Sequence, residues 1–236
     1  MDHTYVNVPI FGGGSRALNI AAGTSTIIVG ANGSGKTRLG VLLENQIPPL
    51  FVQRIAAQKS LTLRDDISLI SFERANNFLR FGGPDFQGAH KSHGRWASKP
   101  ATHLLNDVDA LMQALFSAHN RVASEHLKER KSNPNIEIPV TKLEKSKQIW
   151  EQLLPHRVLE ITEASIQVIP LGSTASARYS GSEMSDGERG IVYFLGQSLV
   201  APDNAVIIVD EPESHVHRAI LRRLWNAFRK NPRELM

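Results

Sequence analysis

The sequence predicts an α/β fold with a mainly parallel sheet flanked by helices, and three observations support this prediction. Residues 30–37 form a glycine-rich segment, GANGSGKT, directly after a short apolar run. A second apolar run, residues 205–209, ends in the acidic segment DEPE. Along the chain, patterns typical of strands alternate with patterns typical of helices, as they do where helices connect parallel strands.

Composition narrows the class of protein. The chain has 236 residues, 41% of them hydrophobic, which suits one large domain with a small insertion. No segment has the length of a membrane span, and the N-terminus lacks a signal-peptide pattern. The chain contains no cysteine, which excludes disulfides and thiolate metal ligands. The net charge of +4 is compatible with a nucleic-acid partner but is weak evidence for one. We therefore expect a cytoplasmic protein without membrane contact.

The N-terminal part of the chain contains the first expected elements. Residues 4–20 read as two extended pieces separated by a glycine triplet, which predicts a hairpin with a short antiparallel β portion. Residues 25–29 predict a strand, and residues 37–46 predict a helix that ends before a pair of prolines. Residues 67–72 predict another strand. Residues 81–99 are rich in Gly, His and Lys and predict a loop.

The middle of the chain predicts two helices. Apolar residues recur there at helical spacing; they are Leu104, Val108, Leu111, Leu115, Val122 and Leu127. A polar connection with two prolines follows at residues 131–139. Thr141 and Glu144 then form a capping box for a second helix. The pair of helices forms either a short antiparallel arm or an ordinary helical subdomain.

The C-terminal part returns to alternating strands and helices. Four elements are expected there: strand-like alternation at 158–169, a helix at 185–200, a buried strand at 205–209 and a helix at 216–230. These elements predict a head formed by residues 1–80 and 157–236. Residues 81–156 are then a loop and helical insertion into that head.

The segment GANGSGKT matches the pattern of a phosphate-binding loop, G-x-x-x-x-G-K-[ST]. Its glycines allow the tight turn that points backbone N–H groups at phosphate oxygens, and the following helix adds its positive end. Lys36 is expected to reach the β- and γ-phosphates of ATP, and the Thr37 hydroxyl to ligate Mg²⁺. The expected nucleotide-binding residues are Asn32, Gly33, Ser34, Gly35, Lys36, Thr37 and Arg38. A chance glycine-rich turn is the alternative, which the flanking strand and helix patterns disfavour.

The acidic end of the run at 205–209 predicts the metal and base side of the same site. Carboxylates at the C-terminal edge of a parallel strand lie where α/β sheets bind ligands. Asp210 is expected to hold Mg²⁺, and Glu211 to orient and polarise the attacking water. The alternative is an acidic strand end that only caps the next helix, a role that suits Glu213.

A third motif precedes the helix expected at 185–200. Ser185 and Glu188 fit a capping box, which is common and needs no further function. A helix start with a serine hydroxyl and the unhindered backbone of Gly187 is also an anion site. The residues alone leave both interpretations open.

The order GANGSGKT, SDGER and IIVDEPE resembles the head of a P-loop NTPase of the ABC-ATPase type. It is similar to the group of SMC, RecF and overcoming-lysogenisation proteins, not to transporter subunits. The resemblance implies that Ser185, Asp186, Gly187 and Glu188 of one copy act in trans on ATP held by another. Nucleotide is then sandwiched between copies. Asp186 stands where this family usually has glycine.

The last third of the chain also resembles ATPases of bacterial anti-phage defence, among them the ATPase subunits of the PARIS system. The resemblance is carried by the segment YSGSEMSDGERGIVYFLGQSLVAPDNAVIIVDEPESHVH. It implies an oligomeric ATPase that works with a nuclease effector of the TOPRIM type. Two other functions stay open: a RecF-like DNA-repair clamp, and a scaffold that binds nucleotide with little hydrolysis.

Some parts of such a head have no certain place in the sequence. The resemblance implies a further strand with a sensor histidine after the last helix, and we expect either a truncated chain or a sheet completed by a partner. It places His215 and His217 in the D-loop, which contacts the opposite copy. The Q-loop residue is expected to be Ser71 or Glu73, with Gln87 as a weaker candidate.

The loop at 81–99 offers two further possibilities. His90, His93 and nearby His103 could bind a metal, although a solvated loop is the favoured interpretation. Three cations of the same loop could contact phosphates of a nucleic acid; they are Lys91, Arg95 and Lys99. A second basic group lies in the last helix, where a solvated face is favoured; it comprises Arg222, Arg223, Arg229 and Lys230.

Overall fold

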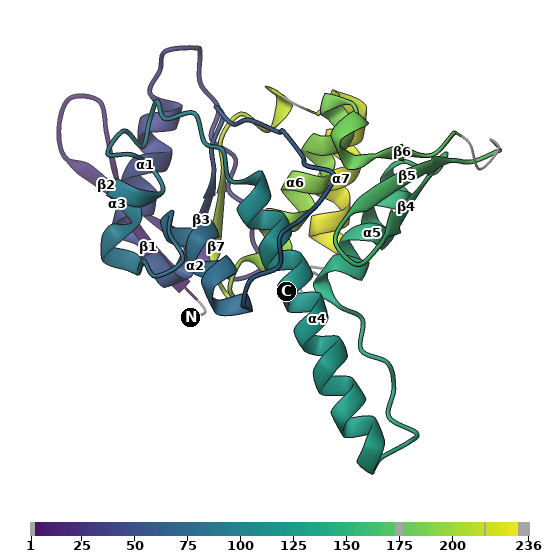
Figure 1. The fold of residues 1–236 in the computed structure, drawn as a ribbon. Coiled ribbons are helices and arrows are strands. Elements are labelled where there is room, and N and C mark those ends of the chain that lie inside the picture. Colours follow the sequence, from purple (N-terminus) through teal and green to yellow (C-terminus); the bar gives the residue numbers. More distant parts are fainter. Residues whose placement is uncertain (1–2, 173–176, 215, 231–236) are drawn as a thin grey trace.

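The computed structural model describes residues 3–172, 177–214 and 216–230 (Figure 1). The fold is mixed α/β, with one small parallel sheet and two short antiparallel sheets. The strands are β1 (His3–Pro9), β2 (Ser15–Ala21), β3 (Val52–Ile55), β4 (Arg157–Ile161), β5 (Ile166–Pro170), β6 (Tyr179–Ser180) and β7 (Val206–Val209). The helices are α1 (Lys36–Gln46), α2 (Phe72–Phe81), α3 (Lys91–Gly94), α4 (Val108–Ser132), α5 (Lys142–Leu153), α6 (Asp186–Val200) and α7 (Arg218–Lys230).

The N-terminal hairpin is confirmed. Strands β1 and β2 pair antiparallel along their whole length, from His3 opposite Ala21 to Pro9 opposite Ser15. The hairpin packs on α1 through buried Val6. The Gln46 side chain fastens it further, since its amide accepts from the backbone N–H of Asn7 and donates to the carbonyl of Asn7.

The parallel sheet is smaller than the sequence predicts, because it consists of β3 and β7 alone, with Val52 opposite Val206 and Ile55 opposite Val209. Helix α1 packs on this pair through Gly40, where an added Cβ would lie 3.6 Å from Ile208. The strand expected within 205–209 is confirmed, but its burial is not, since Ile207 is 38% exposed.

The strands predicted at 25–29 and 67–72 are not formed. Residues 25–29 are irregular and exposed, and no described strand pairs with them. Residues 67–71 are irregular, and α2 begins at Phe72 because Ser71 caps it by accepting from the backbone N–H of Arg74. Residues 67–72 look like a strand in the sequence because several of them are β-branched or apolar. The Ser71 cap instead starts a helix within this run.

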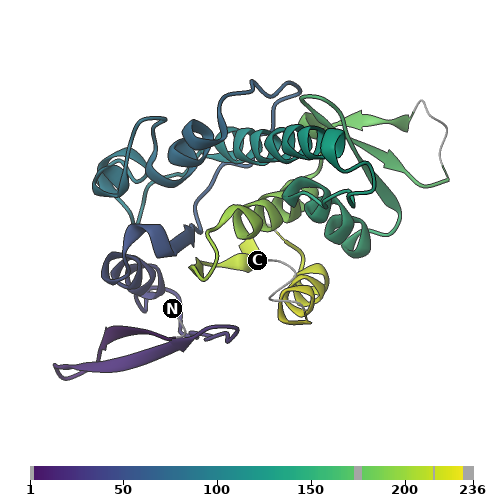
Figure 2. The ribbon, with the colours of Figure 1, turned by 90° about the horizontal axis from the view of Figure 1, so that it is seen from below.

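The main core lies between α6 and the helices around it. Figure 2 shows α6 between α4 on one side and α7 on the other. Gly196 allows the close approach of α4, since a Cβ there would lie 3.0 Å from both Leu111 and Leu115. Trp150 of α5 and Leu224 of α7 are fully buried in the same cluster. The capping box expected at the start of α5 is confirmed.

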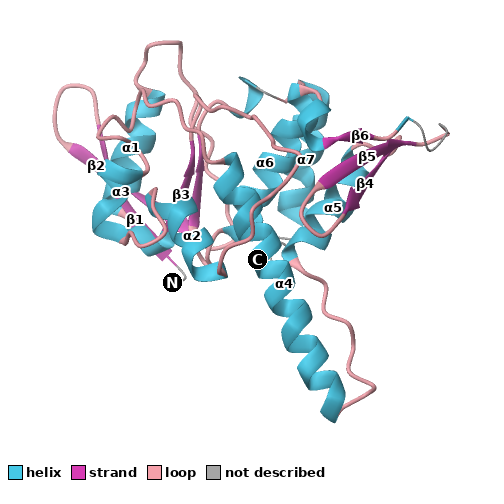
Figure 3. Cartoon of the chain, viewed as in Figure 1, coloured by secondary structure: helices cyan, strands magenta, loops and turns pink. Residues whose placement is uncertain are grey.

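Helix α4 fits the subdomain alternative in its N-terminal half, whereas its C-terminal half projects as a single helix and not as a pair of helices (Figure 3). Its N-terminal half belongs to the core, where most residues from Val108 to Ser117 are buried. Its C-terminal half projects beyond the body of the molecule, and the chain returns along it without regular structure (Figure 3). Strands β4 and β5 form an antiparallel hairpin that β6 extends to three strands. That hairpin accounts for the alternation predicted at 158–169.

Candidate functional site

The glycine-rich segment forms an exposed loop that leads into α1. Gly33 and Gly35 have φ angles of 80° and 91°, in the left-handed region that favours glycine. The ammonium group of Lys36 donates to the carbonyl oxygens of Gly30 and Ala31, at 2.9 and 3.0 Å. Lys36 is therefore held by carbonyl groups of the same glycine-rich loop.

The other residues expected to bind nucleotide surround this loop. Asn32, Ser34 and Arg38 are exposed, and Thr37 is half-buried in the first turn of α1. Helix α1 has no side-chain cap, and the residue at its N-cap is Gly35 in the left-handed conformation. Among the described residues, its first N–H groups therefore receive no capping side chain. They are free to bind an anion.

The acidic strand end lies next to β3. The backbone N–H of Asp210 donates to the Ile55 carbonyl at 3.0 Å, which continues the pairing of β7 with β3. The Asp210 side chain is buried, and its Oδ2 has no hydrogen-bond partner in the described part of the chain. Glu211 is exposed and has a φ angle of 46°, a strained conformation for a residue with a side chain. Ser214 holds this turn, because its backbone N–H and its hydroxyl both donate to the Glu211 carbonyl.

One cavity of about 90 Å³ brings these segments together. The side chains and backbone around it come from four distant parts of the chain: Thr37, Arg54, Gln58, His103, Asp210 and Glu211. The hydroxyl and the carboxylates are the oxygen ligands that Mg²⁺ prefers, and Mg²⁺ needs few protein ligands when phosphates supply others. The described residues contain no group of three His, Cys, Asp or Glu side chains that could hold a metal alone. A Mg²⁺ ion held here by Thr37 and Asp210 would take further oxygen ligands from phosphate or water.

Besides Arg54, the sequence interpretation missed the site residue Gln58. Gln58 follows β3 and lines the cavity, whereas Ser71, Glu73 and Gln87 do not. Ser71 caps α2, Glu73 lies exposed in its first turn, and Gln87 begins a short 3-10 turn. The available signal was the position of Gln58, three residues after a strand. That signal was hidden because β3 itself was not predicted.

The start of α6 is built as a complete capping box. The Ser185 hydroxyl and the backbone N–H of Ser185 both donate to Glu188 Oε2, at 2.7 and 2.8 Å. Glu188 Oε1 accepts from Tyr179 and Arg157 of the neighbouring antiparallel sheet. Burial raises the pKa of Glu188, but these hydrogen bonds outweigh it and hold the pKa below its ordinary value. Glu188 thus fixes the helix start from inside, while Asp186 faces solvent with Ser185.

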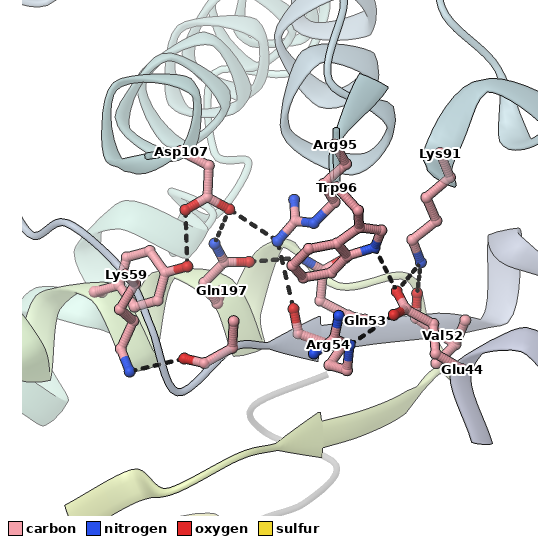
Figure 4. Close-up of polar contacts among 12 residues, drawn as sticks. Glu44, Val52, Gln53, Arg54, Lys59, Lys91, Arg95, Trp96, Asp107 and Gln197 are labelled. Carbon is pink, nitrogen blue, oxygen red and sulfur yellow. Dashed lines mark hydrogen bonds and ion pairs between the residues drawn. The ribbon is translucent and has the colours of Figure 1, made fainter. Parts of the chain in front are cut away.

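A buried network of charged side chains lies behind the cavity (Figure 4). Glu44 of α1 forms ion pairs with Arg54 at 2.6 Å and with Lys91 at 2.8 Å. Burial raises the pKa of Glu44, but the charges of Lys91 and Arg54 lower it by more. Asp107 is the second buried carboxylate of this network, and it pairs with Arg95 at 2.8 Å. These contacts join the helix of the glycine-rich loop to the segment before α4.

Asp107 also forms hydrogen bonds with α6. Asp107 accepts hydrogen bonds from Tyr193 at 2.8 Å and from Gln197 at 2.9 Å, both on that helix. Gln197 in turn accepts from Gln53 of β3. Hydrogen bonds through Asp107 and Gln53 therefore connect α6, the helix capped by Ser185, with β3 beside the cavity (Figure 4).

The basic loop has a different role from the one proposed for nucleic-acid binding. Lys91 and Arg95 are buried and ion-paired, so they do not offer charge to an external phosphate. Lys99 is exposed. His90 stacks on Phe86 with ring centroids 4.9 Å apart.

In the last helix, Arg223 donates to the Leu153 and Gln152 carbonyls at the end of α5. Arg222 is exposed there, while the side chains of Arg229 and Lys230 lie outside the described part.

The two histidines expected in the D-loop differ in what can be said of them. His217 is exposed just before α7, and its carbonyl accepts from the backbone N–H groups of Ile220 and Leu221. His215 lies outside the described residues. Neither residue is among those that line the cavity in the described structure.

Comparisons of the chain with protein-family models, curated proteins and solved structures find no match. Among the described residues, no helix combines the length and apolar character that a membrane span requires. The functional assignment therefore depends on the site itself.

Proposed function

We propose that this chain binds ATP with Mg²⁺ and hydrolyses it, as a P-loop ATPase head of the ABC type. The observation that carries the proposal is the cavity that joins Thr37, Asp210 and Glu211 beside the loop holding Lys36. The finer assignment to the ABC type is supported by the order of the three motifs along the chain. The free Oδ2 of Asp210 supports a ligand with positive charge at this place.

Lys36 and three residues of the cavity then have roles. Lys36 exchanges its two carbonyl contacts for phosphate oxygens. Thr37 and Asp210 would hold Mg²⁺, which neutralises phosphate charge when bound. Glu211 orients the attacking water and accepts its proton. The strained backbone of Glu211, fixed by Ser214, supports a positioned rather than a mobile carboxylate.

A second copy of the chain completes the site in this proposal. Ser185 and Asp186 are exposed, and an added Cβ at Gly187 would meet no described atom within 4 Å. None of these residues lines the cavity of its own chain. A surface of this kind can close over nucleotide held by another copy. ATP-dependent self-association then controls a partner effector, for which the resemblance favours a TOPRIM-type nuclease in anti-phage defence.

The second candidate is a scaffold that binds nucleotide with little hydrolysis. It is favoured by the exposure of Glu211, because a single chain leaves the attacking water poorly shielded from solvent. In both candidates nucleotide binding comes first. They differ in whether the paired form turns ATP over.

Calorimetric titration with ATP and Mg²⁺ tests the proposal. Lys36→Ala should lose binding, since a charge-assisted contact to phosphate is removed. Glu211→Gln should keep binding, lower hydrolysis on the order of 10²- to 10⁴-fold, and accumulate a paired form in light scattering. Lys99→Ala, at an exposed lysine, is the control. Equal hydrolysis by wild type and Glu211→Gln would leave only the scaffold, and a wild type that binds no ATP would contradict both.

A further inference from the structure

Two buried polar atoms of the residues that line the cavity have no hydrogen-bond partner in the described part of the chain. One is Asp210 Oδ2, an acceptor, and the other is Arg54 Nη1, a donor. Buried polar atoms are rarely left unpaired. An unpaired carboxylate oxygen and an unpaired guanidinium nitrogen at one cavity fit a ligand that brings positive and negative charge together.

Arg54 is held in place by contacts that leave this one nitrogen free. Its Nε donates to Glu44 Oε2 and its Nη2 to the Pro100 carbonyl, both at 2.6 Å. Its guanidinium carbon lies 3.9 Å from the ring centroid of Trp96 (Figure 4). The side chain is completely buried. Because two nitrogens and one face are committed, Nη1 keeps a fixed position within a side chain that lines the cavity.

The charge balance around Arg54 also favours an anion. Glu44 is the one carboxylate within ion-pair distance of Arg54 among the described residues, and it is shared with Lys91. Within ion-pair distance, two buried cations therefore face the single carboxylate of Glu44, while Asp210 and Glu211 at the same cavity form no ion pair with either cation in the described part of the chain. Buried charge without compensation is costly, and a bound anion supplies the compensation.

We propose that Arg54 donates from Nη1 to an oxygen of the terminal phosphate of bound ATP. The inference rests on the proposed function, since it takes this cavity as the phosphate end of the nucleotide site. The terminal phosphate is chosen because Asp210 and Glu211, the proposed metal ligand and base, line the same cavity. Arg54 is thereby a phosphate-contacting residue supplied by the same chain that holds the loop.

The affinities of Arg54→Lys for ATP and for ADP, measured with Mg²⁺ by calorimetry, test this proposal. Lysine keeps the charge and can pair with Glu44, but its single nitrogen replaces three and cannot also donate from the position of Nη1. ATP should bind on the order of ten- to hundredfold more weakly, while ADP affinity stays within about twofold. Arg80→Lys is the matched control, because Arg80 is a buried arginine that donates to the Pro49 carbonyl and does not line the cavity. It should change neither affinity.

A purely structural role for Arg54 predicts a different result. ATP and ADP would then weaken equally or not at all, as they would if an ordered water joined Arg54 to Asp210, and either result overturns the proposal. Thermal unfolding checks that Arg54→Lys is folded. Should it be unfolded, Arg54→Gln, which leaves the Glu44 carboxylate paired with Lys91, gives the same comparison. A wild type that binds neither nucleotide would instead count against the proposed function itself.

Discussion

Residues 25–29 form no helix or strand and expose their apolar side chains, whereas the segment from α3 to the start of α4 buries several of its charged side chains. The first segment reads STIIV, and its Ile27 and Val29 are 85% and 88% exposed. The second carries Lys91, Arg95 and Asp107, and all three are buried. The difference teaches that burial follows the available partners more than the polarity of the residue. Apolar residues stay exposed where no described strand pairs with them, and charges enter the interior where they are paired.

In the buried segment, the Asp107 carboxylate accepts from several donors. Arg95 meets Asp107 at 2.8 Å, and Asp107 also accepts from Tyr193 and Gln197. Burial, followed by the charge of Asp107, raises the pKa of Tyr193 well above its ordinary value, so the phenol stays a donor. Paired in this way, a buried carboxylate is tolerated, whereas removal of one partner leaves the other uncompensated.

The largest effect expected from this comparison follows the change Asp107→Ala. It leaves the Arg95 guanidinium buried without its counter-ion, and the free energy of unfolding should fall by about 3–5 kcal/mol. Urea denaturation measures it. Asp109→Ala is the matched control, because the Asp109 side chain is 43% exposed and pairs with the largely exposed Arg64. That change should cost less than about 1 kcal/mol. Similar losses in the two variants would mean that the network around Asp107 contributes no special stability.

Elements fixed by local contacts could be predicted from the sequence, whereas those fixed by the distant contacts of this network could not. Helices whose ends carry capping boxes were predicted well, as at Thr141 with Glu144 and at Ser185 with Glu188. Such caps are local, and three or four neighbouring residues determine them. Strand β3 reads VQRI and was missed, because Gln53 and Arg54 break its apolar pattern although both are buried. Their partners lie far away in the chain, at Gln197 and Glu44.

The candidate site divides in the same way. Thr37, Asp210 and Glu211 stand in motifs that can be recognised one by one, and the cavity brings them together. Gln58 and Arg54 belong to no motif. They reach the cavity because β3 pairs with β7, a contact between residues more than 150 positions apart. Residues placed by such long-range pairing cannot be found from local spacing.

A smaller effect is expected at Lys59, a second buried charge near the cavity. Burial lowers the pKa of Lys59 to about 8, although Asp107, Asp210 and Glu211 raise it in part. The unfolded chain, with a pKa near 10.5, therefore binds more protons between these values, and stability should rise as pH rises from about 8 to 10.5.

Lys59→Met should remove that rise and leave the stem packed near Phe194. The difference in unfolding free energy between variant and wild type should change by on the order of 2 kcal/mol across the window, as measured by urea denaturation at pH 8 and pH 10.5. Lys99→Met, at an exposed position, is the control. Parallel pH profiles for Lys59→Met and wild type would mean that the buried ammonium is stabilised as well as it is in water.

The smallest effect is expected in the exposed residues 25–29. Val29→Ser removes an apolar side chain that is 88% exposed, so the free energy of unfolding should change by less than about 0.5 kcal/mol. Leu43→Ala, in the neighbouring helix α1, removes a side chain that is 5% exposed and should cost about 2–5 kcal/mol. Urea denaturation of both variants at the same protein concentration gives the comparison. A loss above about 2 kcal/mol for Val29→Ser would show that residues 25–29 are covered in solution, and a loss that grows with protein concentration would identify a second copy as the cover.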